Sequence, residues 1–262
     1  MSPLNNKNIE HYIQPNWPQP STIRAYSTTR LSGMSCGASD GLFDSFNLAK
    51  HVNDLEQTVD QNRQLLTKEL ELPSKPFWLE QIHSTQVVEH AQQNATNKIV
   101  RADGCYSTKS DQVCVVMTAD CLPILFCDKK ASWVAAAHAG WRGLADGIIQ
   151  QTIGKYQGDS NNIIAWLGPA ISQKQFEVGA DVKAIFIAKN PSFAAYFKPV
   201  SNDRFMCDLY SIARLILTEY SIETYGGNHC TFAEENRFYS YRRDGETGRM
   251  ASLIWIDSSR KK

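Results

Sequence analysis

Apolar and polar residues alternate in blocks through the middle of the chain. Three apolar runs, Val113–Thr118, Leu122–Cys127 and Trp133–Ala137, are short and partly β-branched, and polar residues separate them. Runs of about four to eight such residues between turn signals are typical of buried strands. The polar residues at the breaks include a thiol, a carboxylate, an imidazole and a guanidinium, which indicates a chemical site built on a rigid frame.

The remaining segments predict further strands and helices around these three runs. Predicted strands cover Ile23–Thr29, Phe77–Ile82, Cys105–Thr108 and Ile163–Leu167, with two more in Arg237–Ile256 around a hairpin-like turn at Arg243–Glu246. Predicted helices run from an Asp54 cap to Leu70 with Leu55, Val59, Leu66 and Leu70 on one face, from Leu144 to Tyr156, from Phe176 to Ala188, and from an Asp208 cap to Tyr220. Strands and helices alternate without an internal repeat or a linker. We therefore expect one α/β domain over residues 1–262, with residues 1–20 as an extended entry segment.

Composition excludes several functional classes. Lys and Arg total 27, Asp and Glu total 27, and no block of five or more like charges occurs, so nothing favours a nucleic-acid or membrane partner. The N-terminal segment lacks the pattern of a signal peptide. The seven cysteines follow no disulfide framework, and Cys105, Cys114, Cys127 and Cys207 are expected to be buried thiols. We expect a cytoplasmic monomer.

His83, Cys121 and His138 each end or follow a predicted strand. Two imidazoles and one thiolate suit Zn²⁺, and three protein ligands leave a fourth position for water or substrate. A second interpretation needs no metal: Cys121 would be a nucleophile and His138 its base, with Asp120 or a carbonyl orienting the imidazole. A buried cysteine beside structural histidines is the third. The residues alone leave all three open.

Two further segments carry charge. The turn His138–Gly143 contains Gly140 and Arg142, and a strand-to-helix turn with an arginine favours binding of phosphate or carboxylate. The tail Phe238–Arg249 combines arginines with aromatic residues, which suits a planar ring and an anion. If this segment is extended, Arg242 faces the site and Arg243 is solvated or paired with Asp244. No Walker A or GxGxxG loop is present, so a nucleotide cofactor is not expected.

Together these segments resemble the bacterial polyphenol-oxidase (laccase) domain family, also called the peptidoglycan-editing-factor or purine nucleoside phosphorylase family. The resemblance runs from Asn47 to Ile256 and rests on long motifs in the same order. These are Trp78–His83 (WLEQIH), Thr118–Pro123 (TADCLP), Ala135–Gly143 (AAAHAGWRG), Leu167–Ala170 (LGPA), Phe176–Gly179 (FEVG) and Phe238–Met250.

The resemblance implies stacked mixed β-sheets flanked by helices, in α/β/β/α order, and a zinc site at His83, Cys121 and His138. Family members are described as purine nucleoside phosphorylases that also deaminate adenosine. From this we expect catalytic roles for Cys121, His138, Asp120 and Arg142. Expected substrate contacts are Asn47, His51, Gly140, Arg142, Tyr239, Arg242 and Arg243, with a purine nucleoside and phosphate as small-molecule partners.

Other activities attributed to the family remain alternatives. A cytoplasmic amidase acting on muropeptide precursors would use Cys121 and His138 or a zinc-activated water, and a purine-binding module would use the same pocket without turnover. Copper polyphenol oxidase chemistry is weaker, because six histidines are too few for several coppers. Two residues depart from the family pattern: Ser84 and Asn53 stand where glycine is usual.

Overall fold

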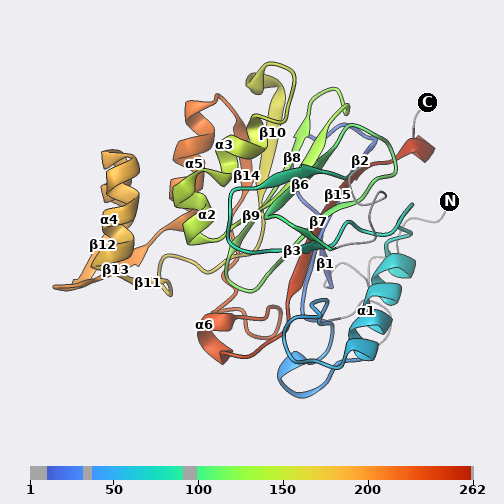
Figure 1. Cartoon of the computed structure of the whole chain (residues 1–262), viewed down its shortest axis with the longest axis horizontal. Helices are drawn as coiled ribbons and strands as arrows, with labels where there is room; N and C mark the ends of the chain where they lie inside the picture. The colour runs from blue at the N-terminus through green and yellow to red at the C-terminus, as the bar shows by residue number, and fades with distance from the viewer. Residues whose placement is uncertain (1–10, 32–36, 91–98, 261–262) are drawn as a thin grey trace.

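The computed structural model describes residues 11–31, 37–90 and 99–260, and two large sheets form its centre (Figure 1). The four-stranded sheet has the order β1 (Tyr12–Ile13), β2 (Ile23–Thr28), β15 (Met250–Ile256), β7 (Cys114–Thr118), all antiparallel. The six-stranded sheet has the order β14 (Glu223–Gly226), β10 (Ile163–Leu167), β8 (Leu122–Asp128), β9 (Val134–Ala139), β6 (Gly104–Ser107), β4 (Val87–Glu89). The first sheet joins the two ends of the described chain, whereas the second contains most of the central strands.

The two sheets pack face to face. Along β7, Cys114 and Val116 contribute to a core shared with the six-stranded sheet, whereas Val115 and Met117 contribute to a different core on the outer face. The same alternation is found along β8, β9 and β15. Side chains of successive strand residues point to opposite faces, so these strands, buried on both faces, are apolar throughout rather than alternating.

Helices cover both outer faces. α1 (Glu56–Glu69) packs Leu66 against Val115 and Trp255 of the four-stranded sheet. The outer face of the six-stranded sheet packs against α2 (Trp141–Asp146), α3 (Ile148–Ile153) and α5 (Leu209–Glu219). The order is therefore helix, sheet, sheet, helix, and the predicted fold class is confirmed.

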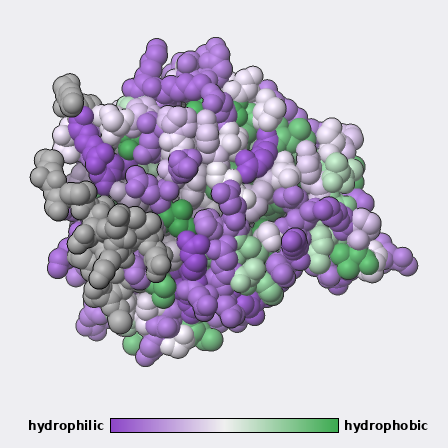
Figure 2. Space-filling view, turned by 180° about the vertical axis from the view of Figure 1, so that it is seen from behind, coloured by the Kyte–Doolittle hydropathy of each residue, from purple (hydrophilic) through white to green (hydrophobic). Residues whose placement is uncertain are grey.

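Two smaller sheets complete the structure. β3 (Leu79–Glu80) pairs with β5 (Val100–Arg101), and β11 (Glu177–Gly179), β13 (Arg204–Cys207) and β12 (Phe197–Ser201) form a three-stranded sheet beside α4 (Ala180–Lys189). This second unit lies at one end of the molecule in Figure 1, and Figure 2 shows a small apolar area on the protruding end seen from behind. The short helices are η2 (Gly41–Phe43), η4 (Ser160–Asn162), η5 (Pro191–Tyr196), η6 (Ser258–Arg260) and α6 (Tyr241–Asp244).

The first helix and the entry segment differ from expectation in detail. α1 begins after Leu55, which is 72% exposed rather than on the inner face, and the carboxylate of Asp54 accepts hydrogen bonds from Ser39, Asn47 and Thr58 instead of capping the helix. Asp54 therefore fixes the preceding loop. The predicted entry segment falls partly in residues 1–10, outside the described residues, and its later part is tied down by β1 pairing with β2.

Two predicted helices form with different bounds and the predicted tail hairpin is wrong, each for an identifiable reason. The helix expected from Phe176 begins only at Ala180, because Glu177–Gly179 pair with β13 and tertiary pairing overrides helical periodicity. The helix expected after Leu144 begins at Trp141 and is divided at Gly147, whose φ of 101° is left-handed. The tail hairpin does not form: the helical turn α6 occupies Tyr241–Asp244, and Ser240 caps it by accepting from the Arg243 N–H.

Candidate active site

The chain crosses from one large sheet to the other at Asp120-Cys121. β7 ends at Thr118 in the four-stranded sheet and β8 begins at Leu122 in the six-stranded sheet. Asp120 has a φ of 89°, an uncommon value for a residue with a side chain, and such values are often found at functional sites. This turn places the Cys121 thiol at the end of the sheet sandwich.

His138 lies beside this turn in the neighbouring strand. It is opposite Pro123 in the β8–β9 register, and its side chain is buried. Its Nδ1 is 2.8 Å from Oδ1 of Asp103, and its backbone N–H donates to the Asp103 carbonyl at 2.7 Å. Since the carboxylate occupies Nδ1, Nε2 is the nitrogen that remains free to bind a metal.

Asp103 also holds the third donor in place. Its carboxylate accepts from the backbone N–H of His83 at 2.9 Å and from both the N–H and the hydroxyl of Ser84, at 2.6 and 2.7 Å. His83 has a left-handed φ of 58°, which turns its ring toward the site. Ser84, one of the two departures from the family pattern, thus adds a hydrogen bond to the carboxylate that supports both histidines. The other departure, Asn53, has a φ of 62°, which asparagine tolerates better than most residues.

The three predicted ligands converge. One donor atom each from His83, Cys121 and His138 lies within 4.8 Å of the others, and Cys121 Sγ is 3.9 Å from Nε2 of His83. A Cβ on Gly140 would come within 2.9 Å of His83 Cδ2 and 3.1 Å of Cys121 Sγ, so only glycine leaves this space clear. The donor chemistry, the fixed tautomer of His138 and this close approach all fit a single bound transition-metal ion.

The charges of the cluster are coupled. Burial opposes ionisation of Cys121, but the positive charge of His138 and a hydrogen bond from it outweigh burial and lower the pKa of the thiol to about 6. Burial likewise opposes the charge on His138, but Cys121 and Asp103 raise the pKa of this imidazole to about 9. At neutral pH the metal-free cluster therefore holds a thiolate, the form that binds metals and acts as a nucleophile.

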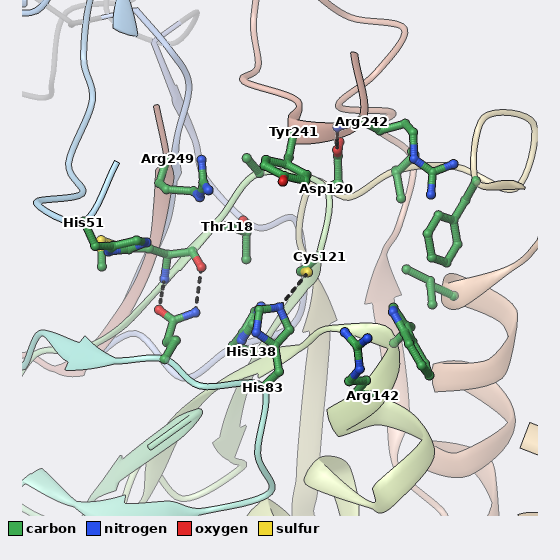
Figure 3. A pocket seen from close by; sticks show the side chains of 17 residues that line it. His51, His83, Thr118, Asp120, Cys121, His138, Arg142, Tyr241, Arg242 and Arg249 are labelled. Atoms are coloured by element: carbon green, nitrogen blue, oxygen red, sulfur yellow. Dashed lines mark hydrogen bonds between the residues drawn. The ribbon is translucent and has the colours of Figure 1, made fainter. Parts of the chain in front are cut away.

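The cluster forms the base of a cavity of about 530 Å³, a size typical of sites for small organic ligands. We call His83, Cys121 and His138, together with the buried Asp103 that supports them, the cavity floor. We call His51, Trp141, Arg142, Tyr241 and Arg242 the cavity rim. Figure 3 shows the labelled rim side chains around the floor, and the walls also include Gln81, Met117, Thr118, Ile171, Phe176, Leu209 and Arg249.

Some predicted substrate contacts lie away from the cavity. Tyr239 is fully buried, and its hydroxyl accepts from the Phe46 N–H and donates to the Phe43 carbonyl. Asn47 is also fully buried. Its side-chain amide nitrogen donates to the Ala49 carbonyl and the Asp54 carboxylate, and its amide oxygen accepts from the N–H groups of Ala49 and Arg249. Both side chains are committed to the packing of the loops around the site, and neither is among the residues that line the cavity.

Asp120 has a supporting rather than an orienting position. Its carboxylate accepts from the Thr231 hydroxyl and from the Arg242 N–H, both at 2.6 Å. It therefore anchors α6 over the cavity, and Asp103 instead of Asp120 orients His138.

The two tail arginines, Arg242 and Arg243, have different surroundings. Arg242 lines the cavity, whereas Arg243 donates to the carbonyls of Thr231, Phe232 and Phe238 and pairs with Asp244 at 2.7 Å. The strand alternation used to distinguish them is absent, since both belong to a helical turn.

Several important residues were missed by sequence reasoning. Asp103 precedes a predicted strand in Ala102-Asp103-Gly104, which was the available signal, but only the pairing of β6 with β9 brings it to His138. Trp141 and Phe176 belong to the family motifs, yet nothing local assigned them to a cavity wall. Arg249 lies in the arginine-rich tail, but the sequence pattern assigned no role to it, and the structure places it in the cavity wall.

The whole chain resembles known proteins. A family model described as "Multi-copper polyphenol oxidoreductase laccase" matches residues 24–257. "Purine nucleoside phosphorylase YfiH" of Escherichia coli is 44% identical over 245 residues, covering 93% of this chain and 98% of that protein. "Purine nucleoside phosphorylase" of Haemophilus influenzae is 45% identical over 250 residues, with 94% and 99% covered.

Solved structures agree. The crystal structure of Neisseria meningitidis protein NMB0706 matches with a TM-score of 0.89 at 44% identity, covering 95% of this chain and all (100%) of that one. YlmD from Geobacillus stearothermophilus matches with a TM-score of 0.82 at 28% identity, with 95% and 97% covered. No helix in the described part of the chain has the length and apolar character needed to cross a membrane. Motifs, fold and near-complete coverage agree, and the chain belongs to the multi-copper polyphenol oxidoreductase laccase family.

Proposed function

We propose that this chain is a zinc-dependent purine nucleoside phosphorylase that cleaves adenosine, inosine and methylthioadenosine. The observation that carries the proposal is one cavity that combines the His83–Cys121–His138 donor group with three arginines and three aromatic rings. The printed names of the relatives, which match over nearly their whole length, support the same reaction class. Absence of a disulfide among the described cysteines fits the expected cytoplasmic location.

Phosphorolysis makes two demands on the protein. An oxygen of phosphate attacks C1′, the bond from C1′ to the purine nitrogen breaks, and the departing base takes the electron pair and a proton. The phosphate must therefore be held near the sugar, and the arginines that line the cavity provide charge-assisted hydrogen bonds for it. The rings of Trp141, Phe176 and Tyr241 provide apolar surfaces for the purine.

The floor would hold the metal through Nε2 of His138, the Cys121 thiolate and His83. Asp103 fixes the tautomer of His138 and the backbone of His83, so the donors are arranged before a ligand arrives. A bound Zn²⁺ would supply Lewis acidity beside the reacting atoms. Since three protein donors leave a further coordination position, deamination of adenosine at C6 is included in the proposal as a slower activity.

Only one group of three metal donors occurs among residues 11–31, 37–90 and 99–260. A multicopper oxidase needs several copper ions with separate ligand sets. The donor set therefore favours one ion and a non-oxidative reaction, in spite of the name of the family model.

A specific observation favours amidase activity as the second candidate. Asp103 lies 2.8 Å from Nδ1 of His138, Cys121 Sγ lies 3.9 Å from Nε2 of His83, and the charge of His138 lowers the pKa of the Cys121 thiol. This is the arrangement of nucleophile, base and orienting carboxylate used in acyl transfer. The substrate would then be a muropeptide precursor, and catalysis would persist after metal removal. A purine-binding module without turnover would use the same cavity.

The deciding experiment follows the products of adenosine, inosine and methylthioadenosine by chromatography, with and without phosphate. We expect free base and ribose 1-phosphate (or its methylthio analogue) only in the presence of phosphate, and loss of both on treatment with a chelator. Equal release of base in phosphate-free buffer would show hydrolysis and contradict the proposal. Cleavage of a muropeptide by the chelated protein would support the amidase instead.

A further inference from the structure

The cavity has two chemically different sides, separated by the floor. Figure 3 shows Arg249 and His51 on one side of Cys121, His83 and His138, and Arg142 and Arg242 on the other. The guanidinium carbon of Arg142 lies 4.3 Å from the centre of the Trp141 ring, and that of Arg242 lies 5.2 Å from the centre of the Phe176 ring. Arg142 and Arg242 are both exposed to solvent.

Arg249 differs from these two exposed arginines. It is partly buried, and its Nη1 donates to the carbonyls of Thr247 and Gly248 at 2.7 and 3.0 Å. Within the described residues no carboxylate lies at ion-pair distance from Arg249. By contrast, Arg237 pairs with Glu234 at 2.8 Å and Arg243 pairs with Asp244 at 2.7 Å. Burial lowers the pKa of Arg249, and the charges of Cys121 and Asp120, which lie beyond ion-pair distance, oppose this shift only in part.

A second guanidinium strengthens the positive potential on the same side. The guanidinium carbon of Arg63 lies 3.9 Å from the centre of the Trp78 ring, and its Nε donates to the Leu48 carbonyl at 2.9 Å. Its Nη2 lies 4.0 Å from the sulfur of Met117, which lines the cavity. Burial lowers the pKa of Arg63 to about 10 against the opposing charges of Asp60 and Glu56, and no carboxylate of the described chain is within ion-pair distance of it. Loss of hydration, then Arg249 and Arg63, lower the pKa of His51, which favours the neutral imidazole, and this form offers one N–H donor.

Two partly buried guanidinium groups without a carboxylate at ion-pair distance carry a cost that an anionic ligand would offset. We propose that Arg249, with His51 beside it, binds the phosphate co-substrate, and that the purine occupies the opposite side, against Trp141 and Phe176. The proposal rests on the phosphorylase function and assigns its two substrates to the two sides. A phosphate anion would accept from the free face of the Arg249 guanidinium and from His51, with Arg63 adding positive potential behind them.

This assignment replaces the sequence-based expectation that Arg142 holds the phosphate. α2 is only six residues long, too short to provide a substantial helix dipole, and the guanidinium carbon of Arg142 lies 4.3 Å from the centre of the Trp141 ring at the exposed rim. An exposed guanidinium stacked on an aromatic ring is better placed to cover a planar base than to balance a buried anion.

The test compares Arg249→Met with Arg142→Met as the matched variant. Removal of a charge-assisted contact predicts that Arg249→Met raises the phosphate KM about ten- to hundredfold while the adenosine KM stays within about twofold. Arg142→Met should show the reverse pattern, with a raised adenosine KM and a phosphate KM within about twofold. Arg249→Lys, which keeps the charge, should lie between wild type and Arg249→Met and guards against a folding defect. An unchanged phosphate KM in Arg249→Met, or a larger increase in Arg142→Met, overturns the assignment.

A binding measurement separates this proposal from the proposed function. Titration of zinc-loaded wild type with inorganic phosphate in a calorimeter should show binding that Arg249→Met loses and Arg142→Met keeps. If wild type binds phosphate in this way but releases no base, the phosphorylase function fails and the anion site stands. If wild type releases base in a phosphate-dependent reaction and Arg249→Met binds phosphate normally, the function stands and the anion site is refuted.

Discussion

The floor and the rim of the cavity are built in different ways. The floor comes from residues at or just after strand ends: Asp103 and His138 are buried, Cys121 is partly buried and His83 is exposed, and the Asp103 carboxylate accepts from His138, His83 and Ser84. The rim comes from a turn at His51 and from the first residues of the short helices α2 and α6, and its Tyr241, Arg142 and Arg242 side chains are exposed. The difference teaches that the proposed metal donors are fixed by the packing of the two sheets, whereas the proposed substrate contacts lie on surface segments that tolerate change.

The largest effect is expected from removing a donor at the floor. Cys121→Ser should reduce the metal content from about one zinc per chain to near zero and abolish turnover, because serine is a poor zinc ligand. The fold should persist, since β8 and β9 remain buried. Elemental analysis measures this, with Cys230→Ser, a partly exposed cysteine outside the cavity walls, as the control that keeps its metal. Stoichiometric zinc in Cys121→Ser would refute this ligand.

The next effect concerns the support of the floor. Asp103→Asn keeps the size of the side chain but removes the charge that orients His138, so zinc affinity should fall about ten- to hundredfold. Competition with a chromophoric chelator measures the affinity. Ser84→Gly removes one hydrogen bond to the same carboxylate. It should also lower the zinc affinity, but by less than Asp103→Asn does. Wild-type affinity in Asp103→Asn would mean that the histidines are held without it.

Substitutions of the two tail arginines should have different effects, because Arg242 lines the cavity whereas Arg243 stabilises the fold. Arg243→Ala leaves the carbonyls of Thr231, Phe232 and Phe238 without a donor and should lower the free energy of unfolding by about 1–3 kcal/mol. Arg242→Ala removes an exposed side chain, so stability should change by less than about 0.5 kcal/mol while the nucleoside KM rises. Denaturant unfolding and steady-state kinetics distinguish the two. Equal stability loss in both variants would contradict the described roles.

The smallest effect is expected at Tyr241. Its side chain is 61% exposed and lines the cavity, so Tyr241→Ala should raise the nucleoside KM only about three- to tenfold by loss of stacking, below the full value of a buried stack. Tyr241→Phe retains the ring and should be nearly neutral. A large decrease in kcat with an unchanged KM would instead place Tyr241 among the reacting groups.

The sequence predicted the floor better than the rim. Apolar runs located β7, β8, β9 and β10 almost to the residue, and the polar residues at their ends include Cys121 and His138, because buried strands have a strong local signal. The position of Asp103 depends on the pairing of β6 with β9, which no local pattern records.

The rim depended on tertiary context. The segment around Arg242 was expected to be extended, but Asp120 fixes a helical turn there through the Arg242 N–H. Tyr239 was expected in the site because it lies in an aromatic and basic motif, yet its ring is in the core and its hydroxyl ties down the loop at Phe43–Phe46. A motif identifies the segment that forms a site, but not which of its side chains point inward.

The central claim, that His83, Cys121 and His138 form one metal site, is tested most directly by anomalous diffraction. Crystals of the protein as purified, measured above and below the zinc absorption edge, should show one anomalous peak bounded by Nε2 of His138, Sγ of Cys121 and the His83 ring. The peak should disappear below the edge. An anomalous peak only at the copper edge, or no peak among these three side chains in crystals grown without chelator, would contradict the account.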